Sequence, residues 1–434
     1  MSVAIYKAYR RQLSVWGIPA LYSGIAMAAA LTFPEQESRL FPQLTSALSV
    51  SAATAIFSSV ASGMIALTGI VFSLTFVMVQ FSATAYSPRL VLWIARDPVM
   101  SHALGIFTAT FLYAIAALVG VDRSGSGRVP FISTVAVGVL LLASVAMFIA
   151  LIQRVGLLQI NRVLVFTGDQ GRKVIAAAYP PLNSTAPPLS PEEFQGLARI
   201  QTLVHEGPPR SLQAVDTAAL VSLAREASAV IEVLAAVGDT LLQSVPLLHV
   251  LGAGAPLDER RLRSAFELGE DRTFEQDPKY ALRLLVDIAI RALSPAVNDP
   301  TTAVQALDQI GDLLLRLGQR QLEIGAYRDS DGTLRLIVPS PTWDDLLQLA
   351  FVEILFCGAS SVQVMRRMNA LVADLALALP ERRRPGMAYW DARIKATIAR
   401  SFVDGESRLE AMSADRQGLG VQSRAPRRDP GPAP

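Results

Sequence analysis

Cysteine and histidine are scarce in this chain of 434 residues, which holds one cysteine and three histidines. The single cysteine, Cys357, excludes an internal disulfide and a metal site built from thiolates. Its apolar surroundings, EILFCGASS, predict a buried and unreactive thiol. The histidines lie far apart in the sequence, at His102, His205 and His249, and lack acidic neighbours at ligand spacing. The sequence therefore predicts no metal site and no cofactor.

The sequence also lacks recognisable catalytic motifs. It contains no GxxxxGK[ST] phosphate loop, no GxSxG nucleophile elbow and no GxGxxG turn after a strand. The glycine-rich GAGAP at 252–256 is too short to define a site. We predict no catalytic residues, and an enzyme is the least favoured class of function.

No strong excess of charge of either sign is present. The 39 basic and 37 acidic residues give a net charge of +2. A nucleic-acid-binding protein needs a basic stripe, and the densest basic cluster is ERRRP at 381–385, which we predict to be a solvated helix end. Nucleic acid is not an expected partner.

Charged residues are sparsest up to residue 160, where only nine basic and four acidic residues occur. The chain as a whole is 51% hydrophobic. This uneven distribution indicates an N-terminal membrane domain, residues 1–153, followed by a soluble domain, residues 154–403.

Four apolar segments in the membrane domain carry no acidic or basic residue, and each reaches the roughly 20 residues that a helix needs to cross a bilayer. They are residues 13–33, 47–81, 101–121 and 131–153. Four transmembrane helices place both termini on one side, which would also hold most of the flanking cations: Lys7, Arg10, Arg11, Arg89, Arg96, Arg154 and Arg162. The positive-inside rule therefore predicts cytoplasmic termini.

The second segment, 47–81, is unusually long and rich in small residues. As one helix it would span on the order of 50 Å, against a bilayer core of roughly 30 Å, so it must tilt, break or protrude. Small and hydroxylated residues recur along it at Ser59, Gly63, Thr68, Gly69 and Ser73. This spacing favours close packing of helices, within one bundle or between protomers, and it also permits a helix that lines a polar path.

The stretch between the second and third segments predicts a short amphipathic helix on the cytoplasmic membrane surface. In SATAYSPRLVLWIARDPVMS, residues 82–101, apolar side chains alternate with Arg89 and Arg96. Tyr86 and Trp93 are aromatic residues of the kind found at headgroup depth.

The soluble part predicts a mixed α/β domain dominated by helix. Strands are expected at 199–205, 211–216 and 244–250, and a hairpin at 325–340 turns on Asp331 and Gly332. Helices are expected at 217–242, 257–269, 278–293, 301–318 and 342–379. The composition of residues 404–434 predicts a disordered tail.

The segment ALSPAVNDPTTA, residues 292–303, has two interpretations. As a turn, Ser294 and Pro295 end one helix, while Asp299 caps the next and Pro300 opens it. This interpretation assigns no role to Asn298, Thr301 or Thr302.

As a site, the same segment would bind one anionic or polar ligand together with two residues from the upstream EDRTF. The helix N-terminus after Pro300 would supply free N–H groups. The side chains would come from Arg272, Thr273, Asp287, Arg291, Asn298, Asp299, Thr301 and Thr302. Both interpretations remain open from the sequence.

Two long segments stand out, SGMIALTGIVFSLTFVMVQFSATAYSPRL at 62–90 and EDRTFEQDPKYALRLLVDIAIRALSPAVNDPTTA at 270–303, with a looser pattern in SLQAVDTAALVSLA. These segments resemble a bacterial family of predicted membrane proteins, the domain of unknown function 2254. The resemblance covers nearly the whole chain apart from the tail. It implies an integral membrane protein of the bacterial inner membrane with four N-terminal helices and a cytoplasmic domain, and it implies no activity.

Three classes of function fit these features. The first is a homo-oligomeric membrane assembly, such as a channel, with a cytoplasmic domain for ligand sensing or assembly. The second is a scaffold whose soluble domain binds a partner protein. The third is an enzyme tethered to the membrane. A conducting path would support the first class, a co-purifying protein the second, and turnover of a substrate the third.

Overall fold

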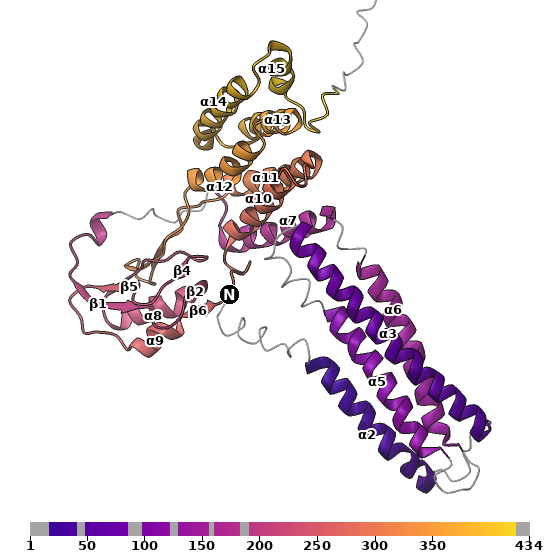
Figure 1. The fold of residues 1–434 in the computed structure, drawn as a ribbon. Helices are drawn as coiled ribbons and strands as arrows, with labels where there is room; N and C mark the ends of the chain where they lie inside the picture. Colours follow the sequence, from indigo (N-terminus) through magenta and orange to yellow (C-terminus); the bar gives the residue numbers. More distant parts are fainter. Residues whose placement is uncertain are drawn as a thin grey trace, which may run out of the picture. The chain divides into compact units, whose positions relative to one another are not determined.

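The structure is a computed structural model that describes residues 17–40, 48–85, 98–121, 129–155, 160–182 and 191–421. The chain divides into two compact units, one of residues Arg11–Gln159 and one of Met1–Arg10 with Ile160–Pro434. Figure 1 shows the helices of the first unit in indigo and purple, while the second unit runs from magenta to yellow.

The first unit is a helix bundle made of α2 (Gly17–Leu40), α3 (Val50–Ala85), α5 (Pro98–Gly120) and α6 (Phe131–Val155). Among the described residues, three helices are long and apolar enough to cross a membrane, over Val50–Leu74, Val99–Gly120 and Phe131–Gln153. The apolar part of α2, Gly17–Phe33, is shorter. The structure therefore supports three of the four predicted spans by length and composition.

Helix α5 packs against each of the other three helices of the bundle. Gly105 lets α2 approach closely, because a Cβ there would lie 2.7 Å from the Tyr22 ring. Hydroxyl groups link α5 to α6 through Thr110 and Ser144, whose oxygens are 2.9 Å apart. The Glu37 carboxylate accepts hydrogen bonds from the first backbone N–H groups of α6. The described polar groups thus tie the helices of one bundle together, as a membrane interior requires.

Helix α3 runs without a break for 36 residues. The helix does not break, which was one of the three possibilities for so long a segment. At 1.5 Å per residue it is about 54 Å long, so it must tilt in the bilayer or protrude from it. The amphipathic helix expected at 82–101 falls largely on residues 86–97, which lie outside the described residues. Residues 82–85 belong to the end of α3, and residues 98–101 to the start of α5.

The second unit begins with α7 (Ile160–Ala178) and contains two sheets. The five-stranded sheet has the order β1 (Arg199–Val204), β5 (Pro246–Leu251), β3 (Val230–Val233), β8 (Leu334–Ile337), β7 (Ala326–Arg328). The three-stranded sheet has the order β4 (Thr240–Leu241), β2 (Arg210–Val215), β6 (Phe266–Gly269). Only the β3–β8 pair is parallel among these strands.

Two predicted helices are shorter than expected because strands replace their second halves. The helix predicted at 217–242 ends as α8 (Thr217–Glu226), and the chain reverses at Ser228, whose φ is 48°. The following VIEV becomes β3, since its β-branched residues pair with β5 and β8. Likewise α9 (Glu259–Ser264) gives way to β6. The strands β1 and β2 are confirmed, but they belong to different sheets.

The remaining helices are α10 (Pro278–Ala292), α11 (Pro300–Gly318), α12 (Trp343–Cys357), α13 (Val362–Ala378), α14 (Arg384–Ser401) and α15 (Gly405–Met412), with short 3-10 turns η2 (Pro191–Glu193) and η3 (Glu381–Arg383). Helix α15 lies in the segment predicted to be disordered. It forms because Asp404 caps it and Ala411 is buried. Residues 422–434 of that segment lie outside the described residues.

The predicted burial of Cys357 is wrong, because this residue is exposed at the end of α12. Partial burial and the nearby Glu353 carboxylate raise the pKa of the thiol above its usual value. A raised pKa disfavours the nucleophilic thiolate. The thiol is accessible and is not activated.

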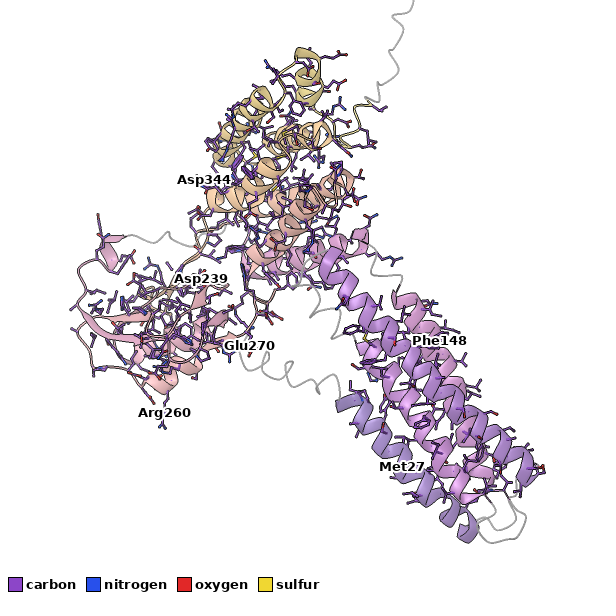
Figure 2. The ribbon with its side chains drawn as sticks, viewed as in Figure 1. Met27, Phe148, Asp239, Arg260, Glu270 and Asp344 are labelled. Carbon is purple, nitrogen blue, oxygen red and sulfur yellow. The ribbon has the colours of Figure 1, made fainter. Side chains whose placement is uncertain are left out.

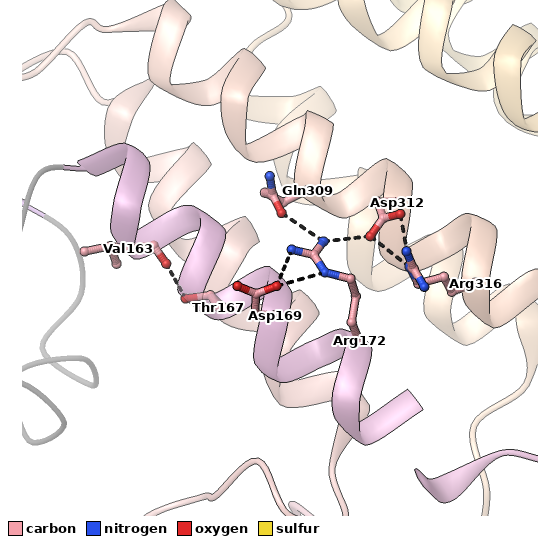
Figure 3. Close-up of polar contacts among 7 residues, drawn as sticks. All are labelled: Val163, Thr167, Asp169, Arg172, Gln309, Asp312 and Arg316. Carbon is pink, nitrogen blue, oxygen red and sulfur yellow. Dashed lines mark hydrogen bonds and ion pairs between the residues drawn. The ribbon is translucent and has the colours of Figure 1, made fainter. Parts of the chain in front are cut away.

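Helix α7 is held against α11 by a polar clamp, drawn in Figure 3. The Arg172 guanidinium donates to Asp312 of α11 (2.7 Å), to Gln309 (3.2 Å) and to Asp169 of its own helix (2.9 Å). Burial alone would raise the pKa of the Asp312 carboxyl, but hydrogen bonds from Arg316 and Arg172 hold this pKa below its usual value. Beside the clamp, a Cβ at Gly171 would lie 2.8 Å from the Leu313 side chain. The position of α7 along α11 is thus fixed by close packing and by charge.

Candidate functional site at the 270–277 loop

The loop that joins β6 to α10, residues 270–277, is fastened along β2. The Gln276 side-chain oxygen accepts from the Val215 N–H at 3.1 Å, and its amide donates to the Val215 carbonyl at 3.4 Å. Gln213, on the same strand, donates to the Asp271 carbonyl. At the start of the loop, Glu270, labelled in Figure 2, pairs with Arg210 at 2.8 Å. These contacts hold the path of the loop at both ends.

A buried ion pair closes the loop. Arg272 donates to Asp277 from Nε at 2.9 Å and from Nη2 at 2.6 Å. Asp277 is 1% exposed and also caps α10, accepting from the Tyr280 N–H at 3.1 Å. Burial raises the pKa of the Asp277 carboxyl above its usual value, although the charge of Arg272 opposes the shift. The pair is therefore costly to break from either side.

Glycine at position 238 allows the backbone to run beside this pair. Its φ of 95° lies in the left-handed region, where side chains are disfavoured. A Cβ at Gly238 would also collide with the carboxylate of Asp277 and crowd the Arg272 guanidinium. Only glycine fits both constraints.

Several buried oxygen atoms at the loop have no hydrogen-bond partner among the described residues. They are Oε1 of Gln213, Oγ1 of Thr273 and Oε2 of Glu275. Gln213 is 2% exposed, so its oxygen cannot reach bulk water. Such groups are costly to bury without a donor. The Gln213 and Glu275 oxygens only accept hydrogen bonds, and the Thr273 hydroxyl can also donate one, so a hydrogen-bond donor suits this loop better than an anion.

The structure separates the residues of the predicted ligand site. Arg272 and Thr273 lie at the N-terminal end of α10, whereas Arg291 and Asn298 lie at its C-terminal end. These ends are about 22 Å apart in a helix of 15 residues. Asp287, between them, pairs with Arg283 of the same helix. One small ligand cannot contact both groups.

The α10–α11 turn itself uses most of the predicted residues structurally. Asn298 has a φ of 48°, a left-handed conformation that asparagine tolerates better than most residues. Asp299 accepts from the Thr302 N–H at 3.1 Å and from its hydroxyl at 2.6 Å. Thr301 accepts from Gln363 at 3.4 Å, and the Arg291 carbonyl accepts from Ser294. The interpretation as a turn thus explains Asn298 and Thr302, which a simple cap did not require.

The loop residues that matter most here were only partly visible in the sequence. Asp277 and Pro278 signal the start of α10, but no local pattern indicates that Arg272 folds back onto Asp277. Gln213 looked like an ordinary strand residue. Its burial follows from the loop that covers β2, and a long-range contact of this kind leaves no periodic signal.

Comparison with known sequences places the chain among membrane proteins. The pattern of a family described as predicted membrane protein, domain of unknown function 2254, matches residues 12–374. The chain belongs to this family. The family description supports the membrane assignment and names no activity.

Relatives occur in mycobacteria. Uncharacterized proteins of Mycobacterium bovis and Mycobacterium tuberculosis are 27% identical to this chain over 432 residues. The alignment covers 95% of this chain and 81% of each relative. No solved structure matches the chain.

Proposed function

We propose that this family member is a multi-pass protein of the bacterial inner membrane that assembles as a homo-oligomer through α3. In this proposal α2, α3, α5 and α6 all cross the bilayer, both termini are cytoplasmic, and the α/β domain senses a ligand or supports assembly. The flanking cations and the four apolar segments support this topology.

The outward face of α3 carries the proposal. Ser59, Gly63, Gly69 and Ser73 are exposed, and a Cβ added at either glycine would meet nothing within 4 Å. Thr68 is partly buried and donates to the Met64 carbonyl of its own helix. The small residues are therefore not used for packing inside one bundle.

Helical geometry separates the two faces of α3. At about 100° per residue, Ser58, Ser62, Gly69 and Ser73 fall within an arc of about 60°, and all are exposed. The buried residues Phe57, Met64 and Val71 lie on the opposite side, toward the core shared with α5. Small residues facing outward gain little from lipid but allow a second backbone to approach closely. A second copy of α3 fits this face.

A channel is the second candidate function, and the hydroxyl groups on the same arc favour it. Two or more α3 helices brought together by this face would line their contact with serine oxygens and with the exposed Gln80. Such a lining can replace part of the hydration of an ion. Single-channel recording from the purified protein in planar bilayers tests conduction.

A scaffold remains the alternative for the soluble unit. Phe356, Leu377 and Leu409 on its C-terminal helices, and Val403 between α14 and α15, are between 73% and 87% exposed. Large exposed apolar residues favour contact with a partner protein. Purification from the native membrane with identification of co-purifying proteins tests this alternative.

Native mass spectrometry in mild detergent tests the oligomer directly. We expect the wild type to be an oligomer, and Gly69→Leu to shift it toward monomer by separating the two backbones. Gly63 lies about 80° outside the arc, so Gly63→Leu should shift the mass less. The chain offers matched controls in Gly24 of α2 and Gly138 of α6, where a Cβ also meets nothing within 4 Å. Gly24→Leu and Gly138→Leu should keep the wild-type mass. A monomeric wild type would reject the proposal.

A further inference from the structure

Arg383 is a buried arginine in the turn between α13 and α14. Its side chain is 7% exposed, whereas Arg382 and Arg384 beside it are exposed. The expectation of a solvated helix end is therefore wrong at this residue. The turn is drawn inward because Leu379 packs over Gly318 at the end of α11.

The guanidinium of Arg383 has only weak partners. Nη2 donates to the Arg320 carbonyl at 3.3 Å, and Nη1 lies 3.7 Å from the Glu323 carboxylate, which is 60% exposed. Nε has no partner among the described residues. Burial lowers the pKa of the guanidinium below its usual value, as expected for a desolvated cation with little compensation.

Arg367, another buried arginine of this unit, provides a contrast. Its side chain is 9% exposed, and its Nε lies 2.7 Å from the Asp308 carboxylate. Its Nη1 also lacks a partner, but the charge itself is neutralised at contact distance. A buried charge normally requires such a partner. The carboxylate paired with Arg383 is that of Glu323, which lies farther away, at 3.7 Å, and is more exposed.

Trp343 places a second unsatisfied donor beside Arg383. The Arg383 guanidinium lies over the face of the Trp343 ring, with its carbon 5.5 Å from the ring centre, and this cation–π contact offsets part of the cost of its burial. Trp343 is 6% exposed, and its indole N–H has no partner among the described residues. Gly386 of α14 comes close to this nitrogen, since a Cβ there would lie 3.3 Å away. Trp343 is the first residue of α12, and the next residue, Asp344, is labelled in Figure 2.

We propose that Arg383 and Trp343 bind the phosphate group of a ligand. Both side chains offer only donors, and the fixed charge of the guanidinium selects an oxyanion. The phosphate would accept from Nε of Arg383 and from the indole N–H. Both nitrogens are closed to water, so the phosphate must open the turn and replace the weak contact with Glu323.

A purely structural role for Arg383 explains only part of this arrangement. The bond from Nη2 to the Arg320 carbonyl ties the turn to the segment that follows α11, and a cation is favourable near a helix C-terminus. It leaves Nε of Arg383 and the indole N–H of Trp343 without partners. Arg383 lies beyond residue 374, where the match to the family ends, whereas Trp343 lies within the matched range.

Binding of inorganic phosphate to the full-length protein in phospholipid-free detergent tests the site. We expect phosphate to raise the unfolding temperature saturably compared with chloride at equal ionic strength. Arg383→Lys keeps the charge but loses the Nε donor, and Trp343→Phe loses only the indole donor. Each should weaken phosphate binding about tenfold, the effect of one charge-assisted hydrogen bond.

Arg382→Gln is the control, because it removes an exposed positive charge next to the site without touching Arg383. It should change the affinity for phosphate less than about twofold. Removal of the competing carboxylate in Glu323→Gln should strengthen binding. Phosphatidylglycerol added to the micelles in place of phosphate distinguishes a lipid headgroup from a soluble ligand. The proposal is overturned if neither compound stabilises the wild type, or if Arg382→Gln weakens binding as much as Arg383→Lys.

Discussion

At the scale of single residues, the Arg272–Asp277 pair carries most of the chemistry of the 270–277 loop. Arg272→Gln would leave a buried carboxylate unpaired and should destabilise the soluble unit by about 3 kcal/mol. The double variant Arg272→Gln with Asp277→Asn should recover much of this loss, because asparagine still caps α10. Thermal unfolding of the full chain, monitored by tryptophan fluorescence, measures both. Equal stability of the single and double variants would contradict the pairing.

The pH dependence of the same variant has a definite sign. A carboxyl group whose pKa is raised in the folded state binds more protons when folded, so its contribution to stability falls as pH rises through that pKa. In Arg272→Gln the opposing cation is gone, which raises the pKa of Asp277 further. Its unfolding temperature should therefore fall, relative to the wild type, as pH rises above about 4, the ordinary pKa of an aspartate.

Asn298 provides the second test at this scale. Asn298→Ala should cost about 1 kcal/mol because alanine disfavours a φ of 48°, whereas Asn298→Gly should be nearly neutral. Asp299→Ala should cost about 1 kcal/mol through loss of the cap. Urea unfolding of the three variants compares them. An alanine variant as stable as the glycine variant would show that the backbone conformation has no influence.

The residue scale also shows what could be foreseen. Asp299 and Pro300 have a local signature, so the turn and its cap were predictable. The burial of Arg383 was not, because it depends on how distant segments pack, and the sequence did not indicate the left-handed conformation of Asn298. The interpretation as a ligand site required Arg272 to converge with Asn298, but the length of α10 separates them.

At the scale of elements, the long amphipathic helices α10 and α11 and the β7–β8 hairpin were predictable from periodicity and turn residues. Strands β3 and β6 were missed because their four-residue runs continue an apolar pattern compatible with helix. Pairing with distant strands decided their conformation. Short elements are determined by partners that a local pattern cannot show.

The contact between α7 and α11 yields a test at this scale. Gly171→Val should collide with Leu313 and cost about 1–3 kcal/mol by overpacking. Arg172→Gln should cost less, since the clamp is partly exposed to solvent. Hydrogen exchange of α7 in the full chain measures the effect. Unchanged protection of α7 in the valine variant would contradict the close contact.

At the scale of the whole molecule, the apolar segments were predictable because bilayer thickness sets a minimum length, and three of them are long enough in the structure. The proposal that both termini are cytoplasmic rests only on the cations that flank these segments. A reporter fused after Gly420 should be active only in the cytoplasm, and one inserted near Gly125 only outside. Periplasmic activity of the first fusion would contradict the proposed topology.

Disulfide cross-linking in native membranes tests the central claim, the pairing of α3 helices between copies, most directly. The single cysteine allows a clean Cys357→Ser background. Ser62→Cys and Ser73→Cys on the outward face of α3 should then form covalent dimers on oxidation. Leu142→Cys, on the outward face of α6 and 71% exposed, should not. Dimers from all three variants alike, or from Leu142→Cys only, would contradict pairing through α3.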